Sequence, residues 1–330
     1  MSNLLEPISI RNIKLENRLI MPPMATEKSE NDGKLSKGII DYYNEKSKGG
    51  YISLIIIEHS FISNEGKASK NQLSIAEDDM IDVLKELSNT IHKNGSKAVM
   101  QINHAGSAAK EDVTGANPVA PSAVAHPRLE VTPHELSKEE IKEIVNKFKN
   151  AAIRVKKAGF DGVEIHSAHG YLLSQFFSPL TNKRTDEYGG DVKSRIKIHL
   201  EIIKEVRKAV GEDFLLLLRL GASDYTEGGV TLEDSLIASK EFEKSGVDIL
   251  DISGGFNGYS VDNKEEQGFF SPLTEAIKKE VNVPVILTGG ITEPKAANDL
   301  LKNDKADLIG VGRAILKDSN WAKNAVESLK

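Results

Sequence analysis

The sequence of 330 residues contains no cysteine. This absence excludes disulfide bonds, zinc sites built from thiolates and cysteine-ligated iron–sulfur clusters. Long hydrophobic runs are also missing: LLLLRL at 215–220 has the length of a strand, far short of the roughly 18 residues of a membrane span. No apolar segment of signal-peptide length opens the sequence. We therefore expect a globular protein of the reducing cytoplasm that does not associate with membranes.

Charge of one sign is not concentrated anywhere along the sequence. The formal net charge is −6 at pH 7, and acidic and basic residues alternate throughout. The basic block of a nucleic-acid-binding protein and a long acidic tail are both missing. We expect small-molecule partners and no nucleic acid.

Short apolar runs alternate with amphipathic segments from one end of the sequence to the other. Most of the runs lack polar alternation, which is typical of strands covered on both faces, as in a parallel sheet. Strands are predicted at 18–24, 52–59, 97–102, 162–166, 214–220, 248–253, 284–289 and 307–312, and helices at 79–95, 137–159, 193–210, 231–246, 271–281, 294–302 and 319–329. This order predicts an α/β fold, a closed (β/α)8 TIM barrel, more strongly than an open doubly wound sheet.

Three segments depart from the repeating strand–helix unit. Residues 8–18, ISIRNIKLENR, predict a hairpin with its turn at Arg11-Asn12 that closes the bottom of the barrel. Long loops at 103–136 and 167–192 follow the third and fourth strands, on the face where barrel enzymes place their chemistry. His126 and His134, in the first of these loops, are expected to be solvated. No linker interrupts the pattern, so residues 1–330 are expected to form a single domain.

Glycines end the seventh and eighth predicted strands. Gly289-Gly290 and Gly312-Arg313 each stand just before a helical segment. Backbone N–H groups at such a position bind phosphate, glycine allows close approach, and an arginine adds a charge-assisted bond. The sequence therefore predicts a phosphate site at this corner of the barrel.

The motif EIHSAHGY at 164–171 allows three interpretations. His166 and His169 are spaced for half of a metal site, with Glu164 as a third ligand of a barrel hydrolase. They are equally compatible with structural histidines or with a cradle for an organic substrate. Arg219, at a strand end, fits either a ligand contact or a buried salt bridge. Spacing alone leaves these alternatives open.

Five stretches together resemble the Old Yellow Enzyme family, whose members are FMN-dependent NAD(P)H:flavin oxidoreductases and ene-reductases. They are PPMAT (22–26), QINHAG (101–106), HSAHGYLLSQFFSPLTNKRTDEYGG (166–190), the arginine of LLLLRLG (215–221) and GVGRAILKDSNW (310–321). PPMAT is similar to the dienoyl-CoA-reductase-like subgroup. The resemblance implies FMN as the cofactor, NADH or NADPH as the electron donor and a small-molecule substrate. It leaves assembly into a homo-oligomer open, and it implies a stand-alone barrel without the cluster and second flavin domain of larger relatives.

The resemblance also implies a role for each matching residue. His166 and His169 would bind the carbonyl or nitro oxygen of the substrate, Tyr171 would protonate its α-carbon, and no metal is expected. Glu27 stands where some relatives place a substrate-contacting tyrosine, and Ala25 where many have cysteine or threonine. The residues matched to FMN binding are Pro22, Pro23, Met24, Ala25, the backbone of His59, Gln101, Arg219 and, for the phosphate, Gly289, Gly290, Gly312 and Arg313. A flavin-binding barrel without turnover, acting as a sensor or flavin store, is the second functional alternative beside the metal-dependent hydrolase.

Overall fold

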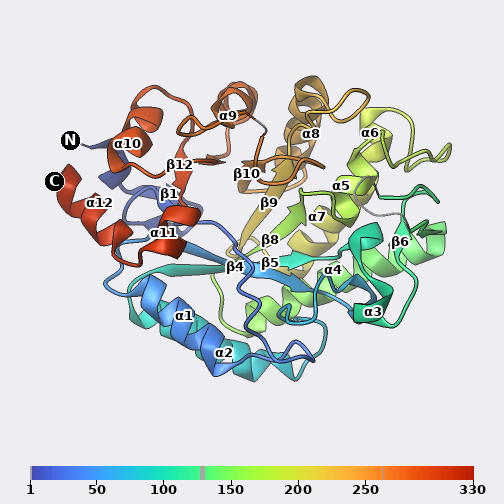
Figure 1. The fold of residues 1–330 in the computed structure, drawn as a ribbon, viewed down its shortest axis with the longest axis horizontal. Coiled ribbons are helices and arrows are strands. Elements are labelled where there is room, and N and C mark those ends of the chain that lie inside the picture. The colour runs from blue at the N-terminus through green and yellow to red at the C-terminus, as the bar shows by residue number, and fades with distance from the viewer. Residues whose placement is uncertain (1, 127–130, 262) are drawn as a thin grey trace.

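The computed structural model of the chain describes every residue except 1, 127–130 and 262, and its centre is a closed barrel of eight parallel strands. The helices are arranged around these strands (Figure 1). In barrel order the strands are β3 (Leu19–Met21), β4 (Leu54–Phe61), β5 (Lys97–Asn103), β8 (Gly162–Ser167), β9 (Leu215–Gly221), β10 (Ile249–Ser253), β11 (Val285–Thr288) and β12 (Leu308–Gly310). The predicted (β/α)8 fold is confirmed, and the open doubly wound sheet is not formed.

Helices follow every barrel strand and cover the outside of the sheet. Ser137 begins the longest of them as predicted: its hydroxyl accepts from the Glu140 N–H at 3.2 Å, and the Glu140 carboxylate accepts from the Ser137 N–H at 2.7 Å. Outside the two long loops, the helices are α1 (Lys37–Ser47), α2 (Met80–Lys93), α4 (Lys138–Lys157), α7 (Lys197–Val210), α8 (Leu232–Lys244), α9 (Ser271–Lys278), α10 (Pro294–Lys302), α11 (Arg313–Lys317) and α12 (Trp321–Leu329). Short 3-10 turns lie at η1 (Asn3–Leu5) and η2 (Asn64–Gly66).

Two predicted elements end differently in the structure. The first barrel strand stops at Met21, because Pro22 and Pro23 have no N–H for the ladder. The helix predicted over 193–210 is divided at Ile196 into α6 (Val192–Arg195) and α7. The break coincides with the buried Arg195, which donates to the Phe177 carbonyl at 2.7 Å and to Asp234 at 2.9 Å.

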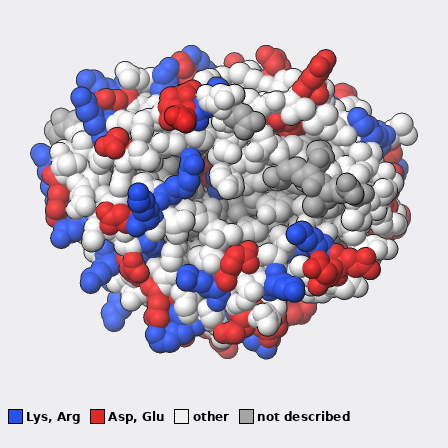
Figure 2. All heavy atoms as spheres, viewed as in Figure 1, with Lys and Arg blue, Asp and Glu red and all other residues white. Residues whose placement is uncertain are grey.

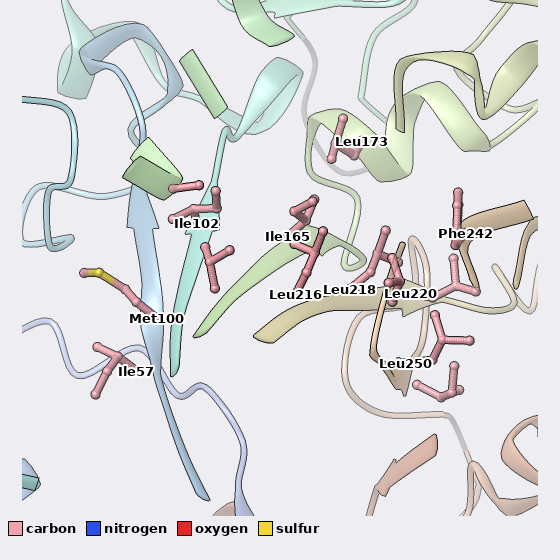
Figure 3. Close-up of a cluster of buried hydrophobic side chains, with 14 of the residues drawn as sticks. Ile57, Met100, Ile102, Ile165, Leu173, Leu216, Leu218, Leu220, Phe242 and Leu250 are labelled. Carbon is pink, nitrogen blue, oxygen red and sulfur yellow. The ribbon is translucent and has the colours of Figure 1, made fainter. Parts of the chain in front are cut away.

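Apolar side chains fill both faces of the barrel wall. Outward residues such as Leu216, Leu218 and Leu220 of β9 pack beneath the helices, as Figure 3 shows. Inward residues such as Leu215 and Leu217 fill the lower part of the interior. This alternation follows the two-residue period of a strand and leaves only the upper interior for polar groups.

The predicted hairpin closes the bottom of the barrel. Strands β1 (Ile8–Ile10) and β2 (Ile13–Leu15) pair antiparallel, and Ile10 and Leu15 join the apolar cluster of the barrel interior. At the turn, Arg11 forms ion pairs with Asp248, just before β10, and with Glu212 at 2.6 Å. The predicted closure of the barrel bottom is confirmed. A ligand site would therefore lie at the opposite end, where the strands have their carboxyl ends.

The two long loops after the third and fourth strands are also confirmed. The first contains η3 (Gly106–Ala108), α3 (Glu111–Thr114), β6 (Val119–Ala120) and β7 (His134–Glu135), and the second contains α5 (Leu172–Phe177) and α6. His134 is exposed as predicted, but the expectation for His126 was wrong. His126 is 3% exposed and lies 5.4 Å, ring centre to ring centre, from Phe256, because the loop folds back toward Gly170. Among the described residues, no helix has the length and apolarity needed to cross a membrane.

Candidate active site

Polar side chains occupy the upper interior of the barrel, directly above the apolar layer. Along β9 the inward positions run Leu215, Leu217, Arg219, and along β10 they run Ile249, Asp251, Ser253. The change from apolar to polar occurs at matching heights on neighbouring strands, because Asp251 pairs in register with Arg219. Figure 2 shows this face of the molecule hollowed near its centre, with acidic and basic side chains interspersed around the hollow.

The mouth is the end of the barrel at which the strands have their carboxyl ends. Its floor is formed by Arg219, Glu164 and Asp251, and the described part of the chain satisfies the hydrogen-bonding capacity of these buried ionisable groups only in part. Arg219 is 4% exposed, and its Nε lies 3.4 Å from Asp251 Oδ2 without hydrogen-bond geometry. Glu164 Oε2 and both carboxylate oxygens of Asp251 also lack a hydrogen-bond partner there. An unsatisfied buried polar group costs about 1–3 kcal/mol, so this floor is built to receive a polar ligand.

The two carboxyl groups of the floor are hard to ionise. Burial, reinforced by the negative charge of Asp251, raises the pKa of Glu164 well above its usual value, although Arg219 opposes the effect. Burial raises the pKa of Asp251 to about 6, again opposed by Arg219. Gln101 is 1% exposed and donates to Glu164 Oε1 at 2.8 Å, so it forms part of this floor.

His166, His169 and Tyr171 lie together at the end of β8 and the start of α5. The ring centres of His166 and His169 are 5.1 Å apart, and those of His166 and Tyr171 are 5.2 Å apart. His169 has a φ of 61°, which turns the chain sharply between the strand and the helix. Its Nε2 lies 2.7 Å from the Ser253 hydroxyl oxygen.

His166 is neutral in this environment. Burial, followed by the nearby His169, Arg219 and His59, holds the pKa of His166 well below its usual value. A neutral imidazole has one N–H donor and one acceptor nitrogen. Glu164 bonds to Gln101 instead of joining the histidines, and the described residues contain no group of three His, Asp or Glu side chains that could hold a metal ion. The three-ligand arrangement required by a metal hydrolase is therefore not formed by these side chains.

The segment after β3 forms one rim of the mouth. Pro22 is buried, Pro23 and Met24 are half-buried, and Ala25 is exposed. Thr26 donates its hydroxyl hydrogen to Glu58 Oε1 at 2.9 Å, so this donor is used within the chain. The outermost member of the predicted set, Glu27, is exposed and accepts a hydrogen bond from Ser69 at 2.7 Å. Within the described residues no hydrogen bond or ring contact joins Glu27 to the histidines.

The four residues of the predicted phosphate site follow two neighbouring strands, β11 and β12. Thr288 of β11 pairs with Gly310 of β12, so the segments that follow each strand are adjacent. None of the hydrogen bonds among the described residues uses the backbone N–H of Gly290, Gly312 or Arg313. Gly290 has a φ of 67°, and a Cβ there would lie 2.8 Å from the Phe269 ring, so only glycine fits without strain. Free N–H donors beside the exposed guanidinium of Arg313 make a site for an anion.

Two side chains at the mouth, those of Asp251 and His59, were assigned no role from the sequence. Asp251 stands two residues after the inward Ile249, so the period of two in DILDIS could have indicated it. Only the backbone of His59 was assigned a role, although its imidazole lies 5.5 Å from the Tyr171 ring. That contact depends on an irregularity of β4, for which the sequence offers no signal.

A single family model describes the chain almost from end to end. The model of the NADH:flavin oxidoreductase / NADH oxidase family matches residues 3–330. The chain belongs to this family.

Individual members of the family resemble the chain over its whole length. It is 42% identical over 331 residues to an NADH oxidase of Thermoanaerobacter brockii, covering 98% of this chain and 51% of that protein. The chain thus spans about half the length of that oxidase. Properties of the other half of the oxidase are not assigned to this chain. It is 38% identical over 331 residues to an NADPH dehydrogenase of Halalkalibacterium halodurans, covering 97% of this chain and 93% of that protein. An old yellow enzyme homologue of Zymomonas mobilis has the same fold, with a TM-score of 0.85 at 27% identity, covering 99% and 93% of the two chains.

The predicted membership of the Old Yellow Enzyme family is therefore confirmed. The chain is an NAD(P)H-dependent oxidoreductase with FMN as its cofactor, as the family and its NADH- and NADPH-named members indicate. The residues present fit FMN. The unsatisfied Arg219 and Glu164 of the floor suit the polar edge of a flavin ring, and the free N–H groups near Arg313 suit its phosphate.

Proposed function

We propose that this FMN-dependent oxidoreductase reduces the C=C bond of α,β-unsaturated carbonyl compounds, and also accepts nitro compounds. The observation that carries this proposal is the cluster of His166, His169 and Tyr171 at the mouth, beside the buried cation of Arg219. FMN, when bound, supplies hydride chemistry: it accepts hydride from NADH or NADPH and donates it to the β-carbon of the substrate.

In this proposal His166 and His169 bind the substrate through its carbonyl or nitro oxygen. Neutral His166 offers one N–H donor. When the Ser253 hydroxyl donates to Nε2 of His169, the remaining proton of that ring is on Nδ1, which then becomes a second donor. Donors aimed at an oxygen that gains negative charge stabilise the transition state and make the β-carbon a better hydride acceptor.

Tyr171 supplies the proton that completes the reduction. Phenols ionise near pH 10 and so remain protonated at neutral pH, which suits a proton donor to carbon. The Tyr171 ring lies beside His166, within reach of a substrate bound to the histidine pair. A nitro group needs no carbon protonation, so its reduction should not depend on this hydroxyl.

The remaining predicted residues are proposed to hold the cofactor in one barrel domain spanning residues 1–330. Arg219 and Gln101 would bind the polar edge of the flavin ring, and the fixed cation would stabilise negative charge on the reduced ring. Glu27, at the exposed rim, would contact the outer part of the substrate. Ring binding would also use Pro22, Pro23, Met24, Ala25 and the backbone of His59, and phosphate binding would use Gly289, Gly290, Gly312 and Arg313.

Stopped-flow spectroscopy of the FMN-loaded protein tests this proposal. NADH or NADPH should bleach the flavin, and cyclohex-2-enone, a nitroalkane or an enoyl thioester should restore its colour without oxygen. Tyr171→Phe should slow the enone step by about 10²- to 10⁴-fold while bleaching and nitro reduction remain normal. His134→Ala, at an exposed histidine of the long loop, serves as the control. A barrel that only stores or senses flavin would not be recoloured by any of these acceptors.

A further inference from the structure

His59 lies in a β-bulge at the end of β4. Pairing with β5 is regular up to Ile57 opposite Met100 and resumes with Ser60 opposite Ile102. Two residues of β4, Glu58 and His59, thus oppose a single residue of β5. The Glu58 N–H leaves the ladder and donates to the Tyr43 hydroxyl at 2.9 Å. Bulges re-aim side chains next to active sites, and here the imidazole of His59 faces the rings of Tyr171 and His166.

The orientation of the His59 ring is fixed by two buried amides. Gln72 accepts from the Ala68 N–H at 2.6 Å through Oε1, which directs its Nε2 toward the His59 carbonyl oxygen at 2.8 Å and Nδ1 at 3.1 Å. Asn103 Nδ2 lies 3.3 Å from the same Nδ1. Because both neighbours present donors, Nδ1 is the acceptor and the proton is on Nε2. Gln72 and Asn103 are 4% and 0% exposed, so these amides hold the His59 ring in a fixed orientation.

The imidazole ring of His59 lies nearly parallel to the phenol ring of Tyr171. The ring centres of His59 and Tyr171 are 5.5 Å apart, and the planes are inclined by 21°. His166 contacts the same tyrosine edge to face, with the planes at 73°. Burial, followed by the positive charge of Arg219, lowers the pKa of His59 to about 4, so the stacked ring is neutral at physiological pH.

We propose that His59 is a positioning residue for Tyr171, holding the phenol ring in the orientation from which its hydroxyl protonates the substrate. The proposal rests on the function proposed above. In the step concerned, hydride has formed a C–H bond at the β-carbon. The Tyr171 O–H bond then breaks, its proton forms a C–H bond at the α-carbon, and water reprotonates the resulting phenolate. His59 neither gives nor takes a proton.

The test compares His59→Ala with His59→Phe, which keeps a planar ring at the same place. In the FMN-loaded full chain, His59→Ala should slow reoxidation by cyclohex-2-enone by about 10- to 100-fold, the loss typical of a misplaced catalytic group. His59→Phe should recover part of that rate, because it restores the stacked ring but not the Nδ1 acceptor that Gln72 and Asn103 contact. Both variants keep the backbone of His59, which is the part proposed to contact the flavin. Bleaching by NAD(P)H, nitro reduction and the Kd for cyclohexanone, read from the flavin spectrum, should therefore change less than about twofold. The solvent isotope effect of the enone step should rise, since proton transfer becomes more limiting.

A double-mutant cycle decides whether His59 acts through Tyr171. The variant His59→Ala/Tyr171→Phe should be no slower than Tyr171→Phe alone, because the hydroxyl to be positioned is already gone. If the two effects multiply, or if His59→Ala has the wild-type enone rate while Tyr171→Phe is slow, the positioning role is wrong and the proposed function stands. If Tyr171→Phe itself has the wild-type enone rate, the proton-donor role fails and the positioning role fails with it.

Discussion

At the scale of single residues, buried polar atoms without partners gather at the floor of the mouth. Arg219, Glu164 and Asp251 are each at most 4% exposed, and all three have side-chain atoms that make no hydrogen bond in the described part of the chain. A protein that retains such groups gives up stability in its free form, and a bound polar ligand restores it. The floor therefore links stability to both pH and cofactor binding.

The pH dependence of stability should reveal the strained carboxyl of Asp251. Its pKa is raised from 3.8 to about 6 in the folded chain, so the folded chain binds the proton more tightly. Its contribution to the free energy of unfolding is therefore greatest at low pH and falls as the pH rises through this window. Between about pH 4 and 7, the apoprotein of Asp251→Asn should lose about 3 kcal/mol less stability than the wild type.

Urea unfolding at a series of pH values measures this difference. Asp213→Asn, at an exposed aspartate, is the matched control and should follow the wild-type curve. The buried histidines contribute to all three proteins, whereas Glu164 differs, because the Asp251 charge raises its pKa. Without that charge the folded-state pKa of Glu164 is lower, which acts in the same direction as the predicted difference. Parallel curves for Asp251→Asn and wild type would contradict the account of the floor.

At the scale of elements, the hairpin β1–β2 contributes apolar side chains to the bottom of the barrel interior. Leu15 is fully buried against the inward residues of the barrel, whereas its neighbour Lys14 is exposed. Leu15→Ala should lower the free energy of unfolding by about 2–5 kcal/mol, although the residue lies outside the barrel strands. Lys14→Ala should change it by less than about 0.5 kcal/mol. Chemical denaturation checks both, and a neutral Leu15→Ala would show that the hairpin does not close the core.

The elements also show which parts of the molecule the sequence could predict. Short, mostly unbroken apolar runs identified all eight barrel strands, because parallel strands are buried on both faces. The resemblance to a known family singled out His166, His169 and Tyr171, which the fold brings together. The division of the helix at Ile196 and the burial of His126 depend on contacts with distant residues, and local patterns do not report such contacts.

The β-bulge of β4 marks the limit of prediction within the site itself. Alternation in LIIIEHSF places Glu58 inward and His59 outward, but the extra residue of the bulge reverses this for His59. The amides that fix the imidazole, Gln72 and Asn103, come from a loop and from the next strand. Only the assembled barrel brings these groups to one place.

At the scale of the whole molecule, cofactor binding should stabilise the fold through two separate sites. A ligand that binds only the folded chain stabilises it by about 2.7 kcal/mol when present at 100 times its Kd. Arg313→Ala should weaken FMN binding by about 1.5–3 kcal/mol, because a charge-assisted hydrogen bond is lost. Riboflavin, which lacks the phosphate, should bind this variant as tightly as the wild type.

Fluorescence titration of the apoprotein with both flavins separates the two contributions. Lys317→Ala, an exposed cation of the same helix α11, is the control and should bind FMN normally. Equal losses for FMN and riboflavin in Arg313→Ala would show that the guanidinium supports the fold of the mouth and does not bind phosphate.

A single turnover without oxygen shows whether the reduced flavin of this barrel passes hydride to a C=C bond. The protein is first bleached with NADPH or NADH and then mixed with cyclohex-2-enone, while the flavin absorbance and the product are followed together. We expect rapid return of the flavin colour with one equivalent of cyclohexanone, and a loss of at least about 10²-fold in rate when His166 and His169 are both replaced by alanine. A flavin that stays bleached in the presence of every enone, or a double variant that turns over at the wild-type rate, would contradict the proposed function.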